Sequence, residues 1–130
     1  MVIDTSAVIA IFLCAPEADR FEMAIVEANV RLLPATCLLE IRMVLASRRN
    51  EDALAALDLW LARIKADIIP VDAELVDIAT QAWLAYGKGR HPASLNFADC
   101  ISYALARRSG EPLLFKGDDF SKTDTIPAVR

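Results

Sequence analysis

The chain has 130 residues, of which 55% are hydrophobic and 25% are charged, a globular composition that can bury the core of one domain. No apolar run reaches the roughly 18 residues of a membrane span, and no positive region precedes the apolar start as it would in a signal peptide. The formal net charge of −4 argues weakly against a nucleic-acid-binding module, although bound divalent cations would offset this charge.

The cysteines indicate a reducing compartment. Cys14, Cys37 and Cys100 are odd in number and widely spaced, so a disulfide framework is not expected. With a single histidine, His91, and no pair of cysteines two residues apart, a structural zinc site is not expected either. We therefore expect one domain over residues 1–130, located in the cytoplasm and without a membrane anchor.

Short apolar runs alternate with longer helical patterns along the first half of the chain. Val2–Ile3 opens as a strand, and either Thr5 or Ser6 can cap the helix that follows it. The expected elements are, in order, a strand at 2–3, a helix to about 14, a helix beginning at 16, a strand at 31–34 and helices at about 36–49 and 51–65. This alternation is typical of an α/β fold.

The second half continues the same alternation and contains the clearest break in the chain, the loop 87–92. Asp72 can cap the helix before this loop, and Ser94 is the candidate cap of the helix after it. The expected elements are a strand at 67–71, a helix ending at Gly87 and Gly89, a helix at about 95–108 ending at Gly110, a strand at 113–115 and a short edge strand at 126–129.

Acidic residues recur where the expected strands end or helices begin. Asp4 follows the first strand, Glu40 lies among apolar residues of the third helix, and Asp99 lies early in the last long helix. Asp118 and Asp119 follow the fourth strand, after a glycine that allows a tight turn. Each residue also has an ordinary structural explanation: a helix cap, an exposed helix face, a partner of the helix dipole or a polar loop.

The placement of these acids together is more informative than any one of them. In an open parallel sheet, functional groups gather outside the carboxyl ends of the strands. Carboxylates from both ends of the chain would form an oxygen-only pocket there, which suits Mg²⁺ or Mn²⁺. Because crowded carboxylates repel each other, the pKa of at least one of them should be raised.

Basic residues lie near these acids in the sequence and could form a rim that binds the phosphate backbone of a nucleic acid. Lys88 and Arg90 are the best candidates, since the glycines around them allow close approach of the backbone to phosphate. Lys116, just before the acidic loop, is a further candidate. Most such residues are simply solvated, and His91 is better explained as a loop residue than as a general base.

In these motifs the chain resembles the PIN-domain ribonucleases, and in particular the VapC-type toxins of bacterial toxin–antitoxin pairs. The resemblance covers essentially the whole chain. It rests on four blocks in this order and spacing: Met1-Val2-Ile3-Asp4-Thr5-Ser6-Ala7, Glu40 in the third helix, Gly87-Lys88-Gly89-Arg90-His91 with Leu95-Asn96-Phe97-Ala98-Asp99-Cys100, and residues 113–124 with Lys116-Gly117-Asp118-Asp119-Phe120 at their centre.

The resemblance implies a three-layer α/β/α sandwich on a short parallel sheet and a Mg²⁺- or Mn²⁺-dependent endoribonuclease. Asp4, Glu40 and Asp99 match the family's acidic positions directly. Asp119 matches the fourth position better, with Asp118 as the alternate. The resemblance also implies inhibition by a cognate VapB-type antitoxin and a homodimer.

The residues and the resemblance agree on one chemistry. Metal held by Asp4 and Asp99 would polarise the scissile phosphate and generate a hydroxide nucleophile, and Glu40 and Asp119 would complete the cluster. An antitoxin arginine could take the metal's place against the same carboxylates. Two alternatives stay open: a non-catalytic binding module with the same fold, and a metal-dependent DNA nuclease or phosphatase.

Overall fold

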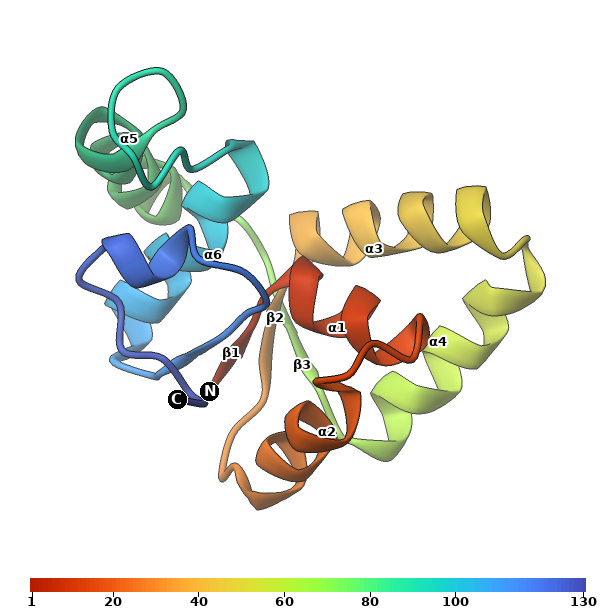
Figure 1. Cartoon of the computed structure of the whole chain (residues 1–130). Helices are drawn as coiled ribbons and strands as arrows, with labels where there is room; N and C mark the ends of the chain where they lie inside the picture. The colour runs from red at the N-terminus through yellow and green to blue at the C-terminus, as the bar shows by residue number, and fades with distance from the viewer.

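The computed structural model describes residues 1–130 as a parallel sheet covered by helices on both faces (Figure 1). Its elements are β1 (Val2–Ile3), α1 (Thr5–Phe12), α2 (Ala18–Glu27), β2 (Leu32–Pro34), α3 (Ala35–Arg48), α4 (Asp52–Arg63), β3 (Asp67–Ile69), α5 (Ala73–Tyr86), α6 (Phe97–Ser109), β4 (Leu113–Leu114) and the 3₁₀ turn Phe120–Lys122. The expected α/β/α sandwich is confirmed. No helix is long and apolar enough to cross a bilayer.

The strand order β3-β2-β1-β4 places the first strand in the middle of the sheet, between the second and the last. Val2 pairs with Leu32 on one side and with Leu113 on the other, and every pairing is parallel. The carboxyl ends of β1 and β4 are therefore neighbours. Asp4 directly follows β1, and the acidic loop follows β4, so residues more than a hundred positions apart meet at one edge of the sheet.

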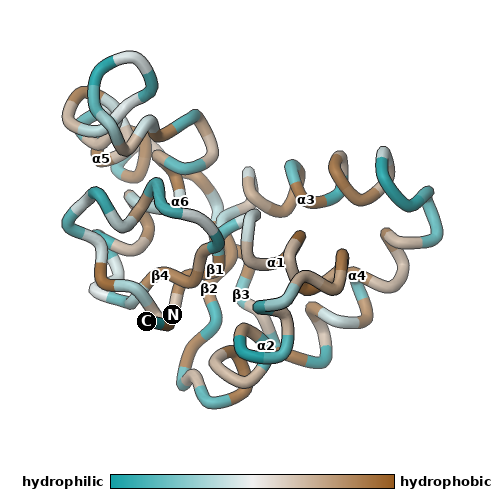
Figure 2. The backbone as a smooth tube through the Cα atoms, viewed as in Figure 1, coloured by the Kyte–Doolittle hydropathy of each residue, from teal (hydrophilic) through white to brown (hydrophobic).

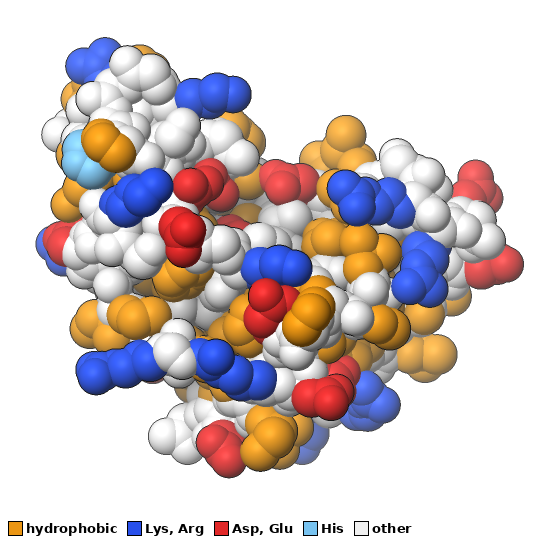
Figure 3. Space-filling view, viewed as in Figure 1, with side chains coloured by type: hydrophobic (Ala, Val, Ile, Leu, Met, Phe, Trp, Pro, Cys, Tyr) orange, Lys and Arg blue, Asp and Glu red, His pale blue; other side chains and the backbone are white.

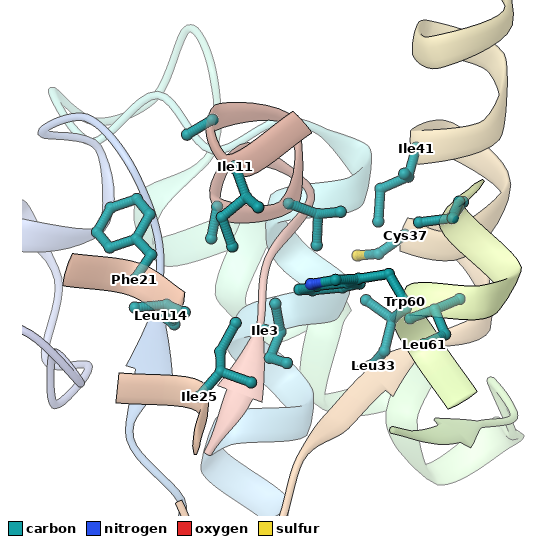
Figure 4. Packing of buried hydrophobic residues seen from close by; sticks show 14 of the residues in the cluster. Ile3, Ile11, Phe21, Ile25, Leu33, Cys37, Ile41, Trp60, Leu61 and Leu114 are labelled. Atoms are coloured by element: carbon teal, nitrogen blue, oxygen red, sulfur yellow. The ribbon is translucent and has the colours of Figure 1, made fainter. Parts of the chain in front are cut away.

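The strands β1 and β4 are apolar and buried on both faces, as expected within a parallel sheet covered by helices, whereas the edge strand β3 is largely exposed. Alternate residues point to opposite faces, so Ile3 and Leu114 pack with α1–α4 while Val2 and Leu113 pack with α5 and α6. Hydropathy is accordingly high along the central strands (Figure 2). In the first of these two clusters, Trp60 lies near Leu33 and Leu61 beside the sheet (Figure 4).

Two helix starts differ from the sequence prediction. The last long helix was expected from about residue 95 with Ser94 as its cap, but Leu95 forms a parallel bridge to Gly87, and α6 begins two residues later. Asn96 is the cap, and it forms a capping box with Asp99. At the first helix, the Asp4 side chain accepts from the Ser6 backbone N–H, so Asp4 caps α1.

The predicted fifth strand at 126–129 is wrong as a strand. The segment pairs with the sheet only through an isolated bridge between Leu113 and Pro127, which is too short to form a strand. The other expected elements are present, with ends displaced by a few residues. Asp72 caps α5 by accepting from the Leu75 N–H, and Gly110 ends α6 in the left-handed conformation, both as expected.

Candidate active site

A pocket of about 590 Å³ lies outside the carboxyl ends of β1 and β4. Asp4, Glu40, Asp99 and Asp119 all line it, and Asp118 does not. Figure 3 shows acidic side chains on both sides of the hollow between the lobe of α5–α6 and that of α1–α4, with Lys and Arg side chains around it. The structure thus brings four predicted carboxylates, from four separate parts of the sequence, to one pocket.

Asp4 is the most enclosed of these acids, with only 2% of its surface exposed. Its Oδ2 accepts from the Ser6 backbone N–H at 2.9 Å and from Ser6 Oγ at 2.6 Å, and its Oδ1 accepts from Ser102 Oγ at 2.6 Å. Ser6 Oγ in turn accepts from the Lys116 backbone N–H at 3.0 Å. These bonds hold the carboxylate at the tip of β1 and tie it to both α6 and the loop after β4.

Glu40 reaches the pocket from α3. Burial raises the pKa of its carboxyl group, the neighbouring charge of Asp4 raises it further, and the Thr5 hydroxyl lowers it. On a freely solvated helix face, burial would not be the main cause of a raised glutamate pKa. Glu40 therefore does not lie on an exposed helix face. Its backbone position follows from α3, which packs Ile41 and Leu45 into the core and leaves the side of Glu40 facing the pocket.

Asp99 is held by the first turn of α6. Its Oδ2 accepts from the Asn96 backbone N–H at 2.9 Å, which is half of the capping box. Burial raises the pKa of Asp99 to about 6; the bond from Asn96 opposes this, and the charges of Asp4, Asp119 and Glu40 add to it. The expected raised pKa is therefore present, with burial as a larger cause than repulsion.

The loop after β4 carries the fourth acid. Gly117 has φ of +100°, a backbone conformation that side chains disfavour, and it turns the chain back toward the pocket. Asp119 then lines the pocket and acts on the pKa of Asp99, whereas Asp118 is exposed outside it. The placement favours Asp119 over Asp118 as the fourth acid.

The predicted basic residues divide into two groups. Lys116 lines the pocket, where its ammonium group lies 3.4 Å from Glu17 in a long, exposed ion pair. Lys88 and Arg90 do not line the pocket; the Arg90 guanidinium lies over the Trp83 ring. His91 is a loop residue, since its Nδ1 accepts from the Ala93 N–H and it is absent from the pocket wall.

Sequence reasoning assigned no site role to three residues that touch the pocket or its acids: Ser6, Thr5 and Ser102. Ser102 lies on the buried stripe of α6. A hydroxyl on such a stripe needs a buried acceptor, and that requirement is the signal that could have identified it. Arg48, one of the basic residues near the acids in the sequence, also lines the pocket, about two helical turns after Glu40 on α3.

The donor chemistry of this pocket suits a hard divalent cation. Its acids offer only oxygen, and the Thr5 hydroxyl, buried at the base, makes no hydrogen bond of normal geometry although it lies close enough to Glu40 to lower the pKa of that residue. As placed in the structure, no three acidic, histidine or cysteine side chains are arranged to coordinate one ion together. Side-chain rotations of the acids would be needed to reach ligand distances of roughly 2.0–2.6 Å.

Comparisons with known proteins place the chain among ribonucleases. The PIN domain family model matches residues 1–126. The chain is 48% identical over 124 residues to the Mycobacterium tuberculosis protein named Ribonuclease VapC30, with 95% of each chain covered. It is equally similar, at 48%, to a Ribonuclease VapC of Mycolicibacterium smegmatis, with 95% of this chain and 96% of that one covered.

Solved structures share the fold. The crystal structure of Mycobacterium tuberculosis VapC20, described as a sarcin-ricin loop cleaving toxin, superposes with a TM-score of 0.78 at 22% identity, covering 99% of this chain and 98% of that one. VapBC2 of Rickettsia felis, bound to a promoter DNA fragment, has a TM-score of 0.74 at 14% identity, covering 97% and 94%. At these identities the likeness concerns the fold alone.

Proposed function

Because the chain belongs to the PIN-domain family and, within it, to the VapC ribonucleases, we propose that its acidic pocket is the site where it hydrolyses RNA with the help of Mg²⁺ or Mn²⁺. The observation that carries this proposal is the pocket shared by Asp4, Glu40, Asp99 and Asp119 at the carboxyl edge of the sheet. The chain is an endoribonuclease toxin. The proposal concerns its dependence on a divalent metal and the roles of these four residues.

In this proposal Asp4 and Asp99 are the principal ligands, and Glu40 and Asp119 complete the coordination directly or through water. When bound, the ion would supply a Lewis acid that polarises the scissile phosphate and lowers the pKa of the attacking water. The enclosed Asp4 fixes the position of the site, since it is held on both carboxylate oxygens. Asp119, on the loop after β4, is the most exposed of the four acids.

The basic residues of the pocket position the RNA. Arg48 and Lys116 enter the wall of the acidic pocket itself and would hold the phosphates next to the scissile bond. Lys88 and Arg90 lie outside the pocket on the loop after α5 and would bind phosphates of the RNA further from the scissile bond. Substitutions at Arg48 should therefore impair cleavage more than substitutions at Arg90.

The deciding experiment compares pools of RNA and DNA incubated with the purified chain and Mg²⁺ or Mn²⁺, with and without a chelator. RNA fragments that appear only without chelator, with DNA intact, would support the proposal. Cleavage of DNA at an equal rate would favour a general nuclease, and release of phosphate from a monoester without chain cleavage would favour a phosphatase. A chain that binds RNA without cutting it would be the non-catalytic module.

We also propose that a VapB-type antitoxin inhibits this site. An arginine of the antitoxin would take the place of the metal against Asp4 and Asp99 through bidentate, charge-assisted bonds. An apolar helix face of the antitoxin would fill the pocket of about 560 Å³ lined by residues of α1, α2 and α4. Leu59, which is 74% exposed, lies on this pocket beside Phe12 and Trp60, so the groove offers apolar surface that nothing in the chain covers.

For the homodimer we propose the face formed by α5 and the start of α6. The Ala- and Leu-rich helix α4 is a poor candidate for this face through Trp60 and Leu61, because both side chains belong to the core. On α5 and α6, by contrast, Phe97 is 77% exposed and stands at the rim of an apolar pocket lined by Val76 and Trp83. A protruding side chain beside a pocket on the same face is self-complementary about a twofold axis, as a symmetric dimer requires.

A further inference from the structure

Behind the acidic pocket, a chain of three buried polar side chains runs from α3 through α6 to Asp4. Ser102 Oγ donates to Asp4 Oδ1 at 2.6 Å, and Cys37 Sγ lies 3.2 Å from the same Ser102 oxygen. Ser102 and Cys37 are both fully buried at 0% exposure. Neither side chain lines the pocket, so neither can touch RNA or a bound ion directly.

The direction of these hydrogen bonds is determined by the number of protons available. Ser102 has one hydroxyl proton, and Asp4 as a carboxylate can only accept, so that proton is donated to Asp4. The contact between Cys37 and Ser102 then requires the thiol to be the donor. Burial raises the pKa of the Cys37 thiol to about 12, with the charge of Asp4 adding to the effect, so the thiol keeps its proton at physiological pH.

The bonds to Asp4 also determine which of its oxygens can still accept. A carboxylate has about four lone-pair positions. Oδ2 receives two hydrogen bonds, both from Ser6, whereas Oδ1 receives only the bond from Ser102. Oδ1 is therefore the oxygen with an accepting position left, and Ser102 determines how that oxygen is oriented.

We propose that Ser102 is a positioning residue for the metal site: it holds Asp4 Oδ1 as the metal-binding oxygen, and Cys37 holds Ser102 in turn. This inference rests on the proposed function, because it assigns a purpose to the orientation of a carboxylate that binds a cation there. Partners that hydrogen-bond to metal ligands typically change metal affinity 10–100-fold when they are removed. A hydroxyl placed only to satisfy buried groups would affect folding stability and not affinity.

The test is direct measurement of Mn²⁺ binding, by the loss of the free-ion electron paramagnetic resonance signal, on the RNA-free chain. Ser102→Ala should weaken binding roughly 10–100-fold. The Mg²⁺ concentration needed for half-maximal cleavage should rise by a similar factor, while kcat at saturating Mg²⁺ recovers. Ser109→Ala is the matched control on the same helix, because the Ser109 hydroxyl donates to the Leu105 carbonyl and is remote from the pocket; its affinity should equal that of the wild type.

A second pair of variants keeps the proposal testable if Ser102→Ala does not fold. Cys37→Ala removes the donor to Ser102 and should weaken Mn²⁺ binding less than Ser102→Ala does, and Cys37→Ser, which retains a donor, should restore part of the loss. Equal Mn²⁺ affinity in the wild type and in folded Ser102→Ala or Cys37→Ala would overturn the inference and leave the proposed function intact. A wild-type chain that binds no Mn²⁺ would overturn the proposed metal site itself, and this inference with it.

Discussion

At the scale of single residues, the acids of the pocket differ in how firmly the surrounding structure holds them. Asp4 is enclosed and hydrogen-bonded on both oxygens, Asp99 is held by one bond from its own helix start, and Asp119 is exposed on a loop. An ion entering this pocket would meet one fixed carboxylate and others that can rotate toward it. Each of these acids can therefore be tested by a substitution that removes its charge.

Asp4→Asn and Asp99→Asn should each abolish metal-dependent RNA cleavage and growth inhibition while the chain stays folded, because each removes a charge that would hold the cation. Cleavage assays with Mg²⁺ and circular dichroism on the same samples would check both halves of this prediction. Asp118→Asn is the control, because Asp118 is exposed outside the pocket and should retain activity, while Asp119→Asn should lose it. Wild-type cleavage by Asp4→Asn or Asp99→Asn would remove that residue from the mechanism.

The raised pKa of Asp99, about 6, predicts how the free energy of unfolding depends on pH when a chelator keeps the chain free of metal. Between its ordinary pKa and about 6, the folded chain binds more protons at this residue than the unfolded chain, so the stabilisation present at low pH is lost as the pH rises through this window. Asp99→Asn keeps an oxygen that can accept from the Asn96 N–H and removes the charge. It should therefore be more stable than the wild type by about 1–2 kcal/mol above pH 7, after allowance for solvent screening.

Urea unfolding of both proteins at pH 4 and pH 7.5 would measure this difference. The advantage of Asp99→Asn should be small at pH 4, where Asp99 is protonated in the folded chain, and should grow up to about pH 6. The charge of Glu40 contributes to the raised pKa of Asp99, so relief of the repulsion between these two residues is part of the expected difference. An advantage of equal size at both pH values would mean that the charge of Asp99 is not what destabilises the chain.

At the scale of elements, α6 connects stability to the site. Its N-terminal capping box contains Asp99, its buried face carries Ser102, and its other end stops at Gly110 with φ of +70°. The helix thus delivers one acid to the pocket and orients another. Changes at its two ends should have separable consequences, because only the N-terminal end touches the site.

Asn96→Ala should destabilise the chain by about 1 kcal/mol, the usual effect of losing an N-cap, because the Asp99 backbone N–H loses its acceptor. It should also reduce cleavage, because the weakened first turn of α6 is the turn that holds the Asp99 carboxylate at the pocket. Gly110→Ala, at the other end of the helix, should also destabilise it by about 1 kcal/mol because alanine disfavours a left-handed φ. Thermal unfolding and RNA cleavage measured together would distinguish them: Gly110→Ala should keep full activity below its melting temperature. Equal losses of activity in both variants would mean that helix stability alone controls the site.

At the scale of the whole molecule, the three surfaces proposed for RNA cleavage, antitoxin binding and dimerisation lie at different places on the two lobes. The acidic pocket lies between them, the groove of α1, α2 and α4 lies on one, and the Phe97 face lies on the other. An antitoxin in the groove and a second copy on the Phe97 face would therefore occupy different sides of the same pocket. This arrangement allows inhibition and dimerisation to be tested independently.

The antitoxin should lose affinity when its inserted arginine is changed to glutamate, because the new carboxylate would meet Asp4 and Asp99 as a like charge. Its affinity should survive changes of Lys88 and Arg90, which lie outside the acidic pocket. Calorimetric titration of the cognate antitoxin into each variant would measure both effects. A complex that leaves the pocket open and RNA cleavage intact would contradict this mode of inhibition.

Phe97→Glu should convert a dimer into a monomer, because two buried carboxylates would then face the apolar pocket of the opposing copy. Light scattering coupled to gel filtration would measure the mass directly. Leu59→Glu is the matched control: it places the same charge on an equally exposed leucine of the other lobe and should leave the dimer intact. A wild-type chain that is monomeric at high concentration would exclude this interface.

The sequence by itself determined the order of the elements, the parallel α/β class, three of the acids that line the pocket and the adjacent pair that contains the fourth. These follow from local rules: apolar runs form strands, helical spacing and capping residues mark helices, and acids placed after strands point to the carboxyl edge of a sheet. Even so, two helix starts and the short segment at 126–129 differed, because capping choice and strand length depend on what each end meets in three dimensions.

Only the tertiary structure decided which polar groups share an environment. Asp119 rather than Asp118 faces the pocket because Gly117 turns the loop, and two adjacent acids look alike in a sequence. Ser102 meets Asp4 across 98 positions of the chain because α6 packs against β1. The raised pKa of Asp99 arises mainly from burial, which no local pattern specifies, since burial depends on every element packed around the residue.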